Sequence, residues 1–319
     1  MDLSKFFPVI GIAIFVIVLI NIDITATAEI MLGADYLLLA LVVMINIPVL
    51  ILKAGKWKLL TTAYGKGISL ARCLHAWIVG FVIGIVTPGR IGELTKAYYF
   101  REDMPTGCGL STIVVDRIID IIVLFTLAIS GTVILIVSYG FIQNEFIIAL
   151  FALFLVFISV TVFVLTRGDF VKRFARPIFN RFVPGKYKTR MKDAFEDFYT
   201  GLGRIKKSRR LVLVSVLISF LTWLVIVFQY KLLAMSLSVQ VDYIFLLSVI
   251  PVVVLLDTLP ISFSGLGTRE LALIFFFGML SIPIETAVSL SLLVFFLTYM
   301  VHVPVGLVLW FIKPIKIRT

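Results

Sequence analysis

Long apolar runs are the feature that most limits what this chain can fold into. Stretches such as "VIGIAIFVIVLI" (9–20) and "LSLLVFFLTYMV" (290–301) contain no charged residue, and hydrophobic residues make up 61% of the 319-residue chain. A helix of about 20 apolar residues spans the hydrocarbon core of a bilayer, whereas the helices of soluble domains are amphipathic. The sequence therefore predicts an all-α polytopic membrane protein, with residues 1–319 forming a single integral membrane domain.

Six of these runs are long enough to cross an apolar core of about 30 Å as helices. The predicted full spans are residues 6–22, 36–52, 109–137, 146–166, 211–233 and 287–311. Segment 6–22 has a second interpretation as a cleaved signal peptide, because Ala26, Thr27 and Ala28 follow it in the small-residue pattern of a cleavage site. The internal repeat described below requires it instead as a permanent span.

Two more apolar blocks, residues 73–100 and 243–280, are each interrupted in the middle. The first breaks at "TPGRIGELTKAYYF" (87–100) and the second at "SFSGLGTREL" (262–271), where small, polar and charged residues interrupt the apolar pattern. Non-helical backbone is tolerated at membrane depth only inside protein or beside a wet cavity. We therefore predict two opposed re-entrant helical hairpins, each of which enters the membrane and leaves by the same side.

Basic and acidic residues fall in loops that this layout places on opposite sides of the membrane. With the N-terminus inside, the internal segments hold most of the Lys and Arg residues, many of them in the basic loop 167–210. The external segments contain no Lys or Arg, and their acidic residues are Asp23, Glu29, Asp35, Glu145, Asp242 and Glu285. This positive-inside pattern predicts a multi-pass protein of the cell membrane with cytoplasmic N- and C-termini. It also accounts for the net charge of +11 without a nucleic-acid partner.

The layout repeats itself in opposite orientation. Residues 1–138 contain two spans, a hairpin entering from inside and a third span, and residues 146–311 contain two spans, a hairpin entering from outside and a third span. The two breaks also share a local pattern, "PGRIGEL" (88–94) and "SGLGTREL" (264–271). An inverted repeat of this kind underlies alternating access in many transporters.

Polar residues at the two breaks form a candidate binding site. They are Arg90, Glu93 and Lys96 after the first break, and Ser264, Arg269 and Glu270 at the second. Helix N-termini near each break would present unpaired N–H groups, which together with the arginines suit a phosphate or a carboxylate. The alternative is structural: Arg90 pairs with Glu93, and Arg269 with Glu270, to neutralise the hairpin tips.

The span 109–137 carries three charged residues, Asp116, Arg117 and Asp120. Charge at this depth is costly unless it is paired or hydrated, so these side chains should face the protein interior. They belong to the substrate site or form a structural ion pair, of Arg117 with Asp120 or with Glu93. A metal-dependent catalytic role of the two aspartates is only weakly indicated, because no histidine stands nearby.

Two other features keep two interpretations each. Asp257, just before the second break, is either a proton or cation site or a residue that caps a helix end. In the basic loop, Phe195, Phe198 and Leu202 fall on one helical face, which would lie on an anionic leaflet. The other interpretation of that loop is a solvated basic segment.

The stretches "TPGRIGELTKAYYF", "GLSTIVVDRIIDIIVLF" and "SFSGLGTREL", in this order, resemble the lysylphosphatidylglycerol synthase transmembrane-region family. In the two-domain relatives a soluble domain aminoacylates phosphatidylglycerol and the membrane domain moves the product between leaflets. The chain ends eight residues past Phe311, so we expect a stand-alone member without the synthase activity. The resemblance places the family's polar residues at Arg90, Glu93, Lys96, Asp116, Arg117, Asp120, Arg269 and Glu270.

The resemblance and the charges together predict flippase-like translocation of an anionic lipid, either a phospholipid or a polyprenyl-phosphate-linked lipid. Membrane lipids with anionic headgroups are the expected partners, a lipid-modifying enzyme is a further candidate, and no catalytic residue, metal or cofactor is expected. "GRIGELTK" lacks the spacing of a phosphate-binding loop, so transport would be downhill, ion-coupled or dependent on a partner. The alternative function is a membrane-embedded transferase, or an accessory subunit of one, acting on lipid-linked substrates.

Overall fold

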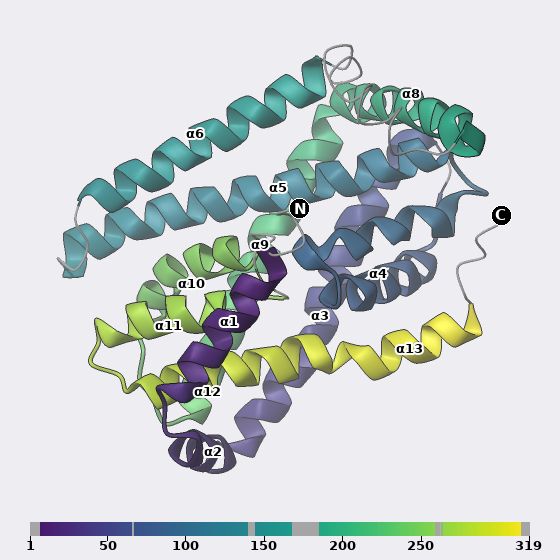
Figure 1. Cartoon of the computed structure of the whole chain (residues 1–319). Coiled ribbons are helices and arrows are strands. Elements are labelled where there is room, and N and C mark those ends of the chain that lie inside the picture. Colours follow the sequence, from purple (N-terminus) through teal and green to yellow (C-terminus); the bar gives the residue numbers. More distant parts are fainter. Residues whose placement is uncertain are drawn as a thin grey trace.

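The computed structural model describes residues 7–65, 67–139, 144–167, 185–258, 262 and 264–313, and all regular structure in them is helical (Figure 1). The longer helices are α1 (Phe7–Ile20), α2 (Ile24–Leu32), α3 (Tyr36–Thr61), α4 (Leu70–Ile85), α5 (Thr106–Ile134), α6 (Asn144–Thr166), α8 (Gly185–Lys207), α9 (Arg209–Ser236), α10 (Tyr243–Asp257), α11 (Thr268–Gly278), α12 (Ile284–Val294) and α13 (His302–Ile312). The shorter or irregular ones are η2 (Thr62–Tyr64), η3 (Pro88–Phe100), η4 (Leu135–Tyr139) and η5 (Phe295–Met300). The predicted all-α class is confirmed.

Four helical stretches within the described residues are long and apolar enough to cross a membrane. They are Tyr36–Tyr64, Thr106–Val137, Arg209–Ser236 and Ile284–Ile312, and they coincide with four of the six predicted spans. Helices α1 and α2 meet at 91° and supply a fifth span if the bent pair counts as one. In α6 the described apolar stretch, Phe151–Val164, is shorter than a span. The numbers of six spans and two re-entrant hairpins therefore stay predictions.

Helix α3 is longer than the sequence pattern predicted. It continues to Thr61, whereas the expected span ended at residue 52 and left Lys53 and Lys56 in an internal loop. The helix continues because its last two turns are buried: Trp57 and Leu60 are fully covered, and Lys56 is 2% exposed. A lysine with a buried ion-pair partner does not end a helix. The prediction placed the end of α3 too early because it relied on charge alone.

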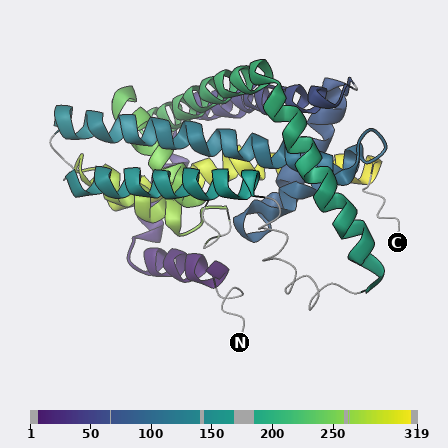
Figure 2. The same ribbon diagram turned by 90° about the horizontal axis from the view of Figure 1, so that it is seen from above.

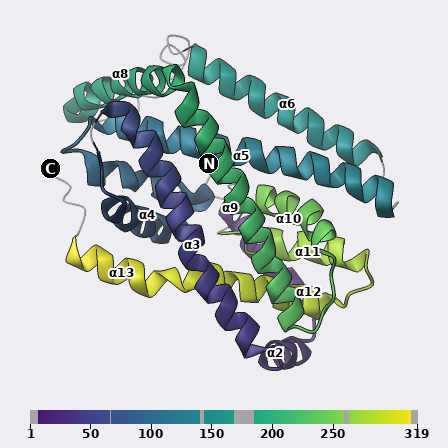
Figure 3. The ribbon, with the colours of Figure 1, turned by 180° about the vertical axis from the view of Figure 1, so that it is seen from behind.

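The helices pack as a layered bundle around a shared apolar core. Helices α3 and α9 run side by side (Figure 3), and α5 packs on both α9 and α10. Leu124, Phe245 and Leu273 bring α5, α10 and α11 into one cluster of buried side chains. Gly131 permits the close approach of α5 to α10, because a Cβ there would collide with the backbone of Ser248. Helix α6 lies beside α5 at the edge of the bundle (Figure 1).

The basic segment forms a helix that packs on the protein. Helix α8 crosses one end of the bundle (Figure 2) and contacts α5. Its Leu202 and Ile205 are buried, and the Gly107 backbone lies directly against Ala194. The part of the apolar face at Leu202 is therefore covered by protein and not available to a leaflet. Residues 168–184 of the predicted loop lie outside the described residues.

The chain departs from helical geometry at both predicted breaks. Gly89 and Arg90 have φ of 58° and 56°, which separates α4 from η3. At the second break Ser264 and Gly265 also have positive φ, of 48° and 84°. The hydroxyl of Ser264 donates a 3.0 Å hydrogen bond to the backbone oxygen of Ile85 at the end of α4. The two breaks, far apart in sequence, are therefore direct neighbours.

Candidate functional site

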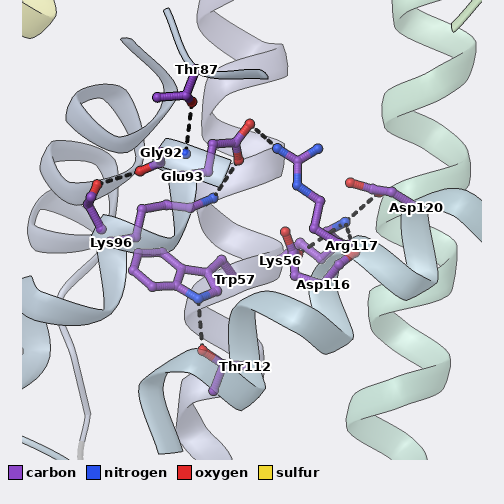
Figure 4. Close-up of polar contacts among 11 residues, drawn as sticks. Lys56, Trp57, Thr87, Gly92, Glu93, Lys96, Thr112, Asp116, Arg117 and Asp120 are labelled. Carbon is purple, nitrogen blue, oxygen red and sulfur yellow. Dashed lines mark hydrogen bonds and ion pairs between the residues drawn. The ribbon is translucent and has the colours of Figure 1, made fainter. Parts of the chain in front are cut away.

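Glu93, in η3 after the first break, bridges two cationic side chains (Figure 4). Its Oε2 accepts a 3.0 Å hydrogen bond from Lys96 Nζ, and its Oε1 pairs with Arg117. Glu93 and Lys96 are 2% and 1% exposed, whereas a third of the Arg117 side chain is accessible. Gly84 on α4 makes room for this arrangement, because a Cβ there would lie 2.8 Å from Glu93 Cγ. Glu93, Lys96 and Arg117 form the Glu93 cluster, which ties η3 to α5.

A second buried cluster joins α3, α5 and α9. Lys56 Nζ lies 3.1 Å from Asp116 Oδ1 and 2.5 Å from Asp120 Oδ1 (Figure 4). Ser219 on α9 donates a further hydrogen bond to Asp120. These four residues form the Lys56 cluster. Because lysine occupies the space between the two carboxylates, their geometry does not support a metal-dependent catalytic role. Within the described ranges no group of three or more His, Cys, Asp and Glu side chains could hold a metal ion.

Trp57 lies beside the Glu93 cluster, next to Lys56 in the chain. The Lys96 ammonium lies over the rings of Trp57 and Trp77, 5.6 Å from each centroid. Trp57 Nε1 donates a 3.0 Å hydrogen bond to Thr112 Oγ1 on α5. An indole face attracts a cation while its N–H satisfies a neighbouring acceptor, so Trp57 fixes η3, α3 and α5 relative to one another.

The second break holds a third cluster. Arg269 Nη1 lies 3.7 Å from Asp257 Oδ2, and Nη2 lies 3.8 Å from Glu270 Oε1. Arg269 Nε donates to Ser291 Oγ at 2.8 Å, and that hydroxyl donates to Glu270 Oε1 at 2.6 Å. Arg269, Glu270 and Ser291 are fully buried, and Asp257 is 4% exposed. These four residues form the Arg269 cluster.

The N-terminus of α11 is already occupied. The Gly267 N–H donates a 2.6 Å hydrogen bond to Glu270 Oε2. A side chain of the helix therefore caps the N–H group that the sequence had offered to a ligand. The predicted pairing of Arg269 with Glu270 is found, with Asp257 as an additional partner.

Arg90 does not form the predicted pair with Glu93. Its guanidinium lies over the rings of Phe81 and Tyr299, 5.8 Å and 4.9 Å from their centroids. Its Nε is buried without a hydrogen-bond partner, and no acidic side chain among the described residues forms an ion pair with it. The pairing fails because Arg90 has a left-handed backbone conformation, whereas Glu93 faces α5 and pairs there with Arg117.

Arg90 lines a cavity of about 90 Å³ between the two halves of the sequence. Residues of α3, α4 and η3 line one part, and residues of α9, α10, α12, η5 and α13 line the rest. Lys53 is the second cation in the wall, and its ammonium lies 4.9 Å from the ring centroid of Trp223. No carboxylate is among the described residues that line the cavity. Its volume is enough for several water molecules.

Two polar side chains complete the cavity wall. Gln229 Nε2 donates to Asn46 Oδ1 at 3.0 Å and to the backbone oxygen of Val42 at 3.1 Å. Asn46 in turn donates to the backbone oxygen of Leu297. Helices α3, α9 and η5 are thus held together beside the two cations. This part of the wall combines fixed amides with aromatic rings.

The predicted site residues occupy three clusters and a cavity instead of one pocket. Arg90 alone of them lines the cavity. Sequence reasoning missed Lys53, Lys56 and Tyr299 because it assigned the lysines to a loop and the tyrosine to an ordinary span. A signal was present: Lys53 and Trp57 continue the helical spacing of Asn46 past residue 52.

Comparison with known proteins assigns the chain to a family. Residues 8–306 match the family described as the lysylphosphatidylglycerol synthase TM region. The chain belongs to this family. The match covers nearly all the described helices, which include those that carry the three clusters and the cavity. The described part of this lysylphosphatidylglycerol synthase transmembrane region contains no strand.

Two curated relatives of the chain are described as membrane proteins. The UPF0104 membrane protein MJ1595 of Methanocaldococcus jannaschii is 26% identical over 286 residues, which is 85% of this chain and 83% of the relative. The UPF0104 membrane protein PH1989 of Pyrococcus horikoshii is 20% identical over 308 residues, 89% of this chain and 90% of the relative. No solved structure matches the chain. The family and the apolar helices agree with a membrane location and a lipid-related membrane function.

Proposed function

We propose that this protein moves a lipid with an anionic headgroup between the leaflets of the cell membrane. The cavity between the two sequence halves carries the proposal, because Arg90 and Lys53 line it without any carboxylate in its described wall. Phospholipids and polyprenyl-phosphate-linked lipids share a phosphate group, and this is the chemistry the cavity would recognise.

Electrostatics supports an anionic ligand. Arg90 and Lys53 have aromatic rings as their closest partners, and a cation–π contact contributes only about 0.5–2 kcal/mol. Removing a cation from water without a counterion costs far more than such contacts return. A phosphate beside Arg90 and Lys53 would supply the missing negative charge, and the guanidinium can bind two phosphate oxygens at once.

The other predicted site residues act on the lipid indirectly in this proposal. The Glu93 cluster sets the position of η3, which carries Arg90, and the Lys56 cluster fixes the part of α3 that carries Lys53. The Arg269 cluster and Ser264 hold the second break against α4. Lipid contact is therefore assigned to Arg90 and Lys53.

The predicted topology belongs to the same proposal: six spans, two opposed re-entrant hairpins, an inverted repeat and cytoplasmic termini. The hydrogen bond from Ser264 to Ile85 and the mixed lining of the cavity support the inverted repeat, because they bring the two breaks and the two halves together. A cysteine introduced at Asp242 should react with an impermeant thiol reagent from outside, and one at Lys186 should not. The native Cys73 and Cys108 are buried, which keeps the background reaction low. The reverse labelling would overturn this orientation.

Lipid movement can be measured directly with purified protein in vesicles. Fluorescent phosphatidylglycerol is bleached by an impermeant reductant, and the rate at which protected lipid becomes accessible reports translocation. Arg90→Gln and Lys53→Gln should each slow it about 10-fold or more, because a hydrogen bond to a charged group contributes about 1.5–3 kcal/mol. Lys206→Gln, on the exposed face of α8, is the matched control and should behave as the wild type.

Two outcomes would contradict the proposal. Equal rates for the wild type, Arg90→Gln and Lys53→Gln would remove the cavity from the function. A chemically altered headgroup in the recovered lipid would favour the alternative, a membrane-embedded transferase on lipid-linked substrates. Fluorescent phosphatidylcholine, which has no net charge, should move more slowly than phosphatidylglycerol.

A further inference from the structure

The Arg269 cluster contains two carboxylates and one guanidinium. Asp257 and Glu270 both lie within 4 Å of Arg269, and all three are buried. When both carboxylates are ionised, the cluster has one excess negative charge. An excess buried charge is stable only if a further cation, a proton or water compensates it.

Arg90 lies near this cluster and can offset part of its excess negative charge. Its guanidinium and that of Arg269 lie over the same ring, that of Tyr299, and Arg90 interacts electrostatically with Asp257. The other titratable groups around Asp257 are Glu270 on α11, Tyr230 on α9 and Tyr299 on η5. Arg90 is the cation among these groups that lines the cavity, and it has no ion-pair partner within the described residues.

The two carboxyl groups differ in their surroundings. Glu270 accepts hydrogen bonds from the Gly267 N–H and the Ser291 hydroxyl. Neither oxygen of Asp257 has a hydrogen-bond partner in the described part of the chain. Gly265 packs directly against this carboxyl group, because a Cβ there would lie 2.5 Å from Oδ1. Asp257 is therefore the carboxyl group that is available to take up a proton.

We propose that Asp257 takes up a proton when an anionic headgroup binds Arg90, so that one proton travels with each lipid. The proposal rests on the proposed function and adds its energy source. A bound phosphate engages the positive charge of Arg90 and leaves the Arg269 cluster with its excess negative charge. A proton from water on the entry side then forms an O–H bond on Asp257 and is released when the headgroup leaves. By linkage, protonation of Asp257 strengthens headgroup binding to the same extent.

Proton uptake on lipid binding tests this in purified protein. Soluble short-chain phosphatidylglycerol is added in weak buffer with a pH indicator, and short-chain phosphatidylcholine serves as the zwitterionic comparison without net charge. The wild type should take up about one proton per bound phosphatidylglycerol. Asp257→Asn should bind the lipid without proton uptake, and Asp257→Glu should restore the uptake. Glu29→Gln, an exposed carboxylate on α2, is the matched control and should match the wild type.

Vesicles with an imposed pH gradient provide the second readout. Tracer phosphatidylglycerol should accumulate in the leaflet facing the alkaline side, up to about 10-fold per pH unit for one proton per lipid. Asp257→Asn should move lipid but no longer accumulate it, and protein-free vesicles give the passive background.

The outcomes separate this inference from the proposed function. Transport that ignores the pH gradient, or proton uptake that persists in Asp257→Asn, overturns the inference and leaves the function standing. A response to a sodium gradient in place of a proton gradient also overturns it. If the wild type neither binds nor moves phosphatidylglycerol, the proposed function fails as well. Should Asp257→Asn not fold, Asp257→Glu and the two lipids tested on the wild type still decide the result.

Discussion

The guanidinium groups of Arg90 and Arg269 lie over the ring of the same tyrosine, Tyr299, at 4.9 Å and 5.4 Å from its centroid. The two arginines come from different breaks of the chain. Arg269 is neutralised by Asp257 and Glu270, whereas Arg90 lines the cavity. Tyr299 belongs to η5, a π-helical turn between α12 and α13, and such turns frequently occur at functional sites.

The shared ring predicts different effects for two substitutions of Tyr299. Tyr299→Phe keeps an aromatic face for both guanidinium groups and should retain most of the transport rate and thermal stability. Tyr299→Leu removes two cation–π contacts of about 0.5–2 kcal/mol each and should lower the melting temperature and slow transport several-fold. Vesicle transport and thermal unfolding in detergent measure both effects. Equal behaviour of the two variants would show that the ring contacts carry no energy.

Removing Lys56 should destabilise the fold strongly. Lys56→Met leaves Asp116 and Asp120 buried without their cation, which costs about 3–5 kcal/mol of the free energy of unfolding. The triple variant Lys56→Met, Asp116→Asn and Asp120→Asn removes all three charges and should recover much of that loss. Denaturant titration in detergent measures the difference, with Lys206→Gln as the exposed lysine control. A triple variant that is less stable than Lys56→Met would contradict the role assigned to the charges.

The Glu93 cluster should respond unequally to loss of its members. Glu93→Gln leaves two cations without a partner, one of them fully buried. Arg117→Gln leaves Glu93 still paired with Lys96, and the Arg117 side chain is one-third exposed. We therefore expect Glu93→Gln to lower the melting temperature more than Arg117→Gln. The opposite order would show that the exposed partner dominates the cluster.

Replacing two glycines in neighbouring helices by alanine should change the free energy of unfolding in opposite directions. In Gly84→Ala the new Cβ would lie 2.8 Å from Glu93 Cγ, so the Glu93 side chain must shift away from its partners. Such overpacking costs about 1–3 kcal/mol. Gly55→Ala, in α3, meets no atom within 4 Å and should stabilise the helix by about 0.5–1 kcal/mol. Unfolding titrations of the two variants should therefore shift in opposite directions, and a shift in the same direction contradicts the close packing of α4 on η3.

The local pattern of the chain was sufficient for the all-α class and for the two places where the predicted breaks occur. Apolar runs predicted helices, because only a helix satisfies the backbone within a single apolar segment. Gly89 and Gly265 marked the two departures from helical geometry, since glycine adopts positive φ without steric cost. The positions of charged residues were a poorer guide to where α3 ends. Lys53 and Lys56 were assigned to a loop, but α3 carries both in its last turns.

Which charges meet was decided by the tertiary structure. The sequence left Arg117 with two candidate partners and Arg90 with either an anionic ligand or Glu93. The fold pairs Glu93 with Arg117 and turns Arg90 onto Tyr299. It also brings Lys56 to Asp120, although neither is near the other in the chain. The reason is physical: helical spacing fixes which residues share a face, whereas the rotation and contacts of each helix depend on packing with all its neighbours. Apolar runs therefore determined a helical membrane protein, and only helix packing decided which cation faces the cavity.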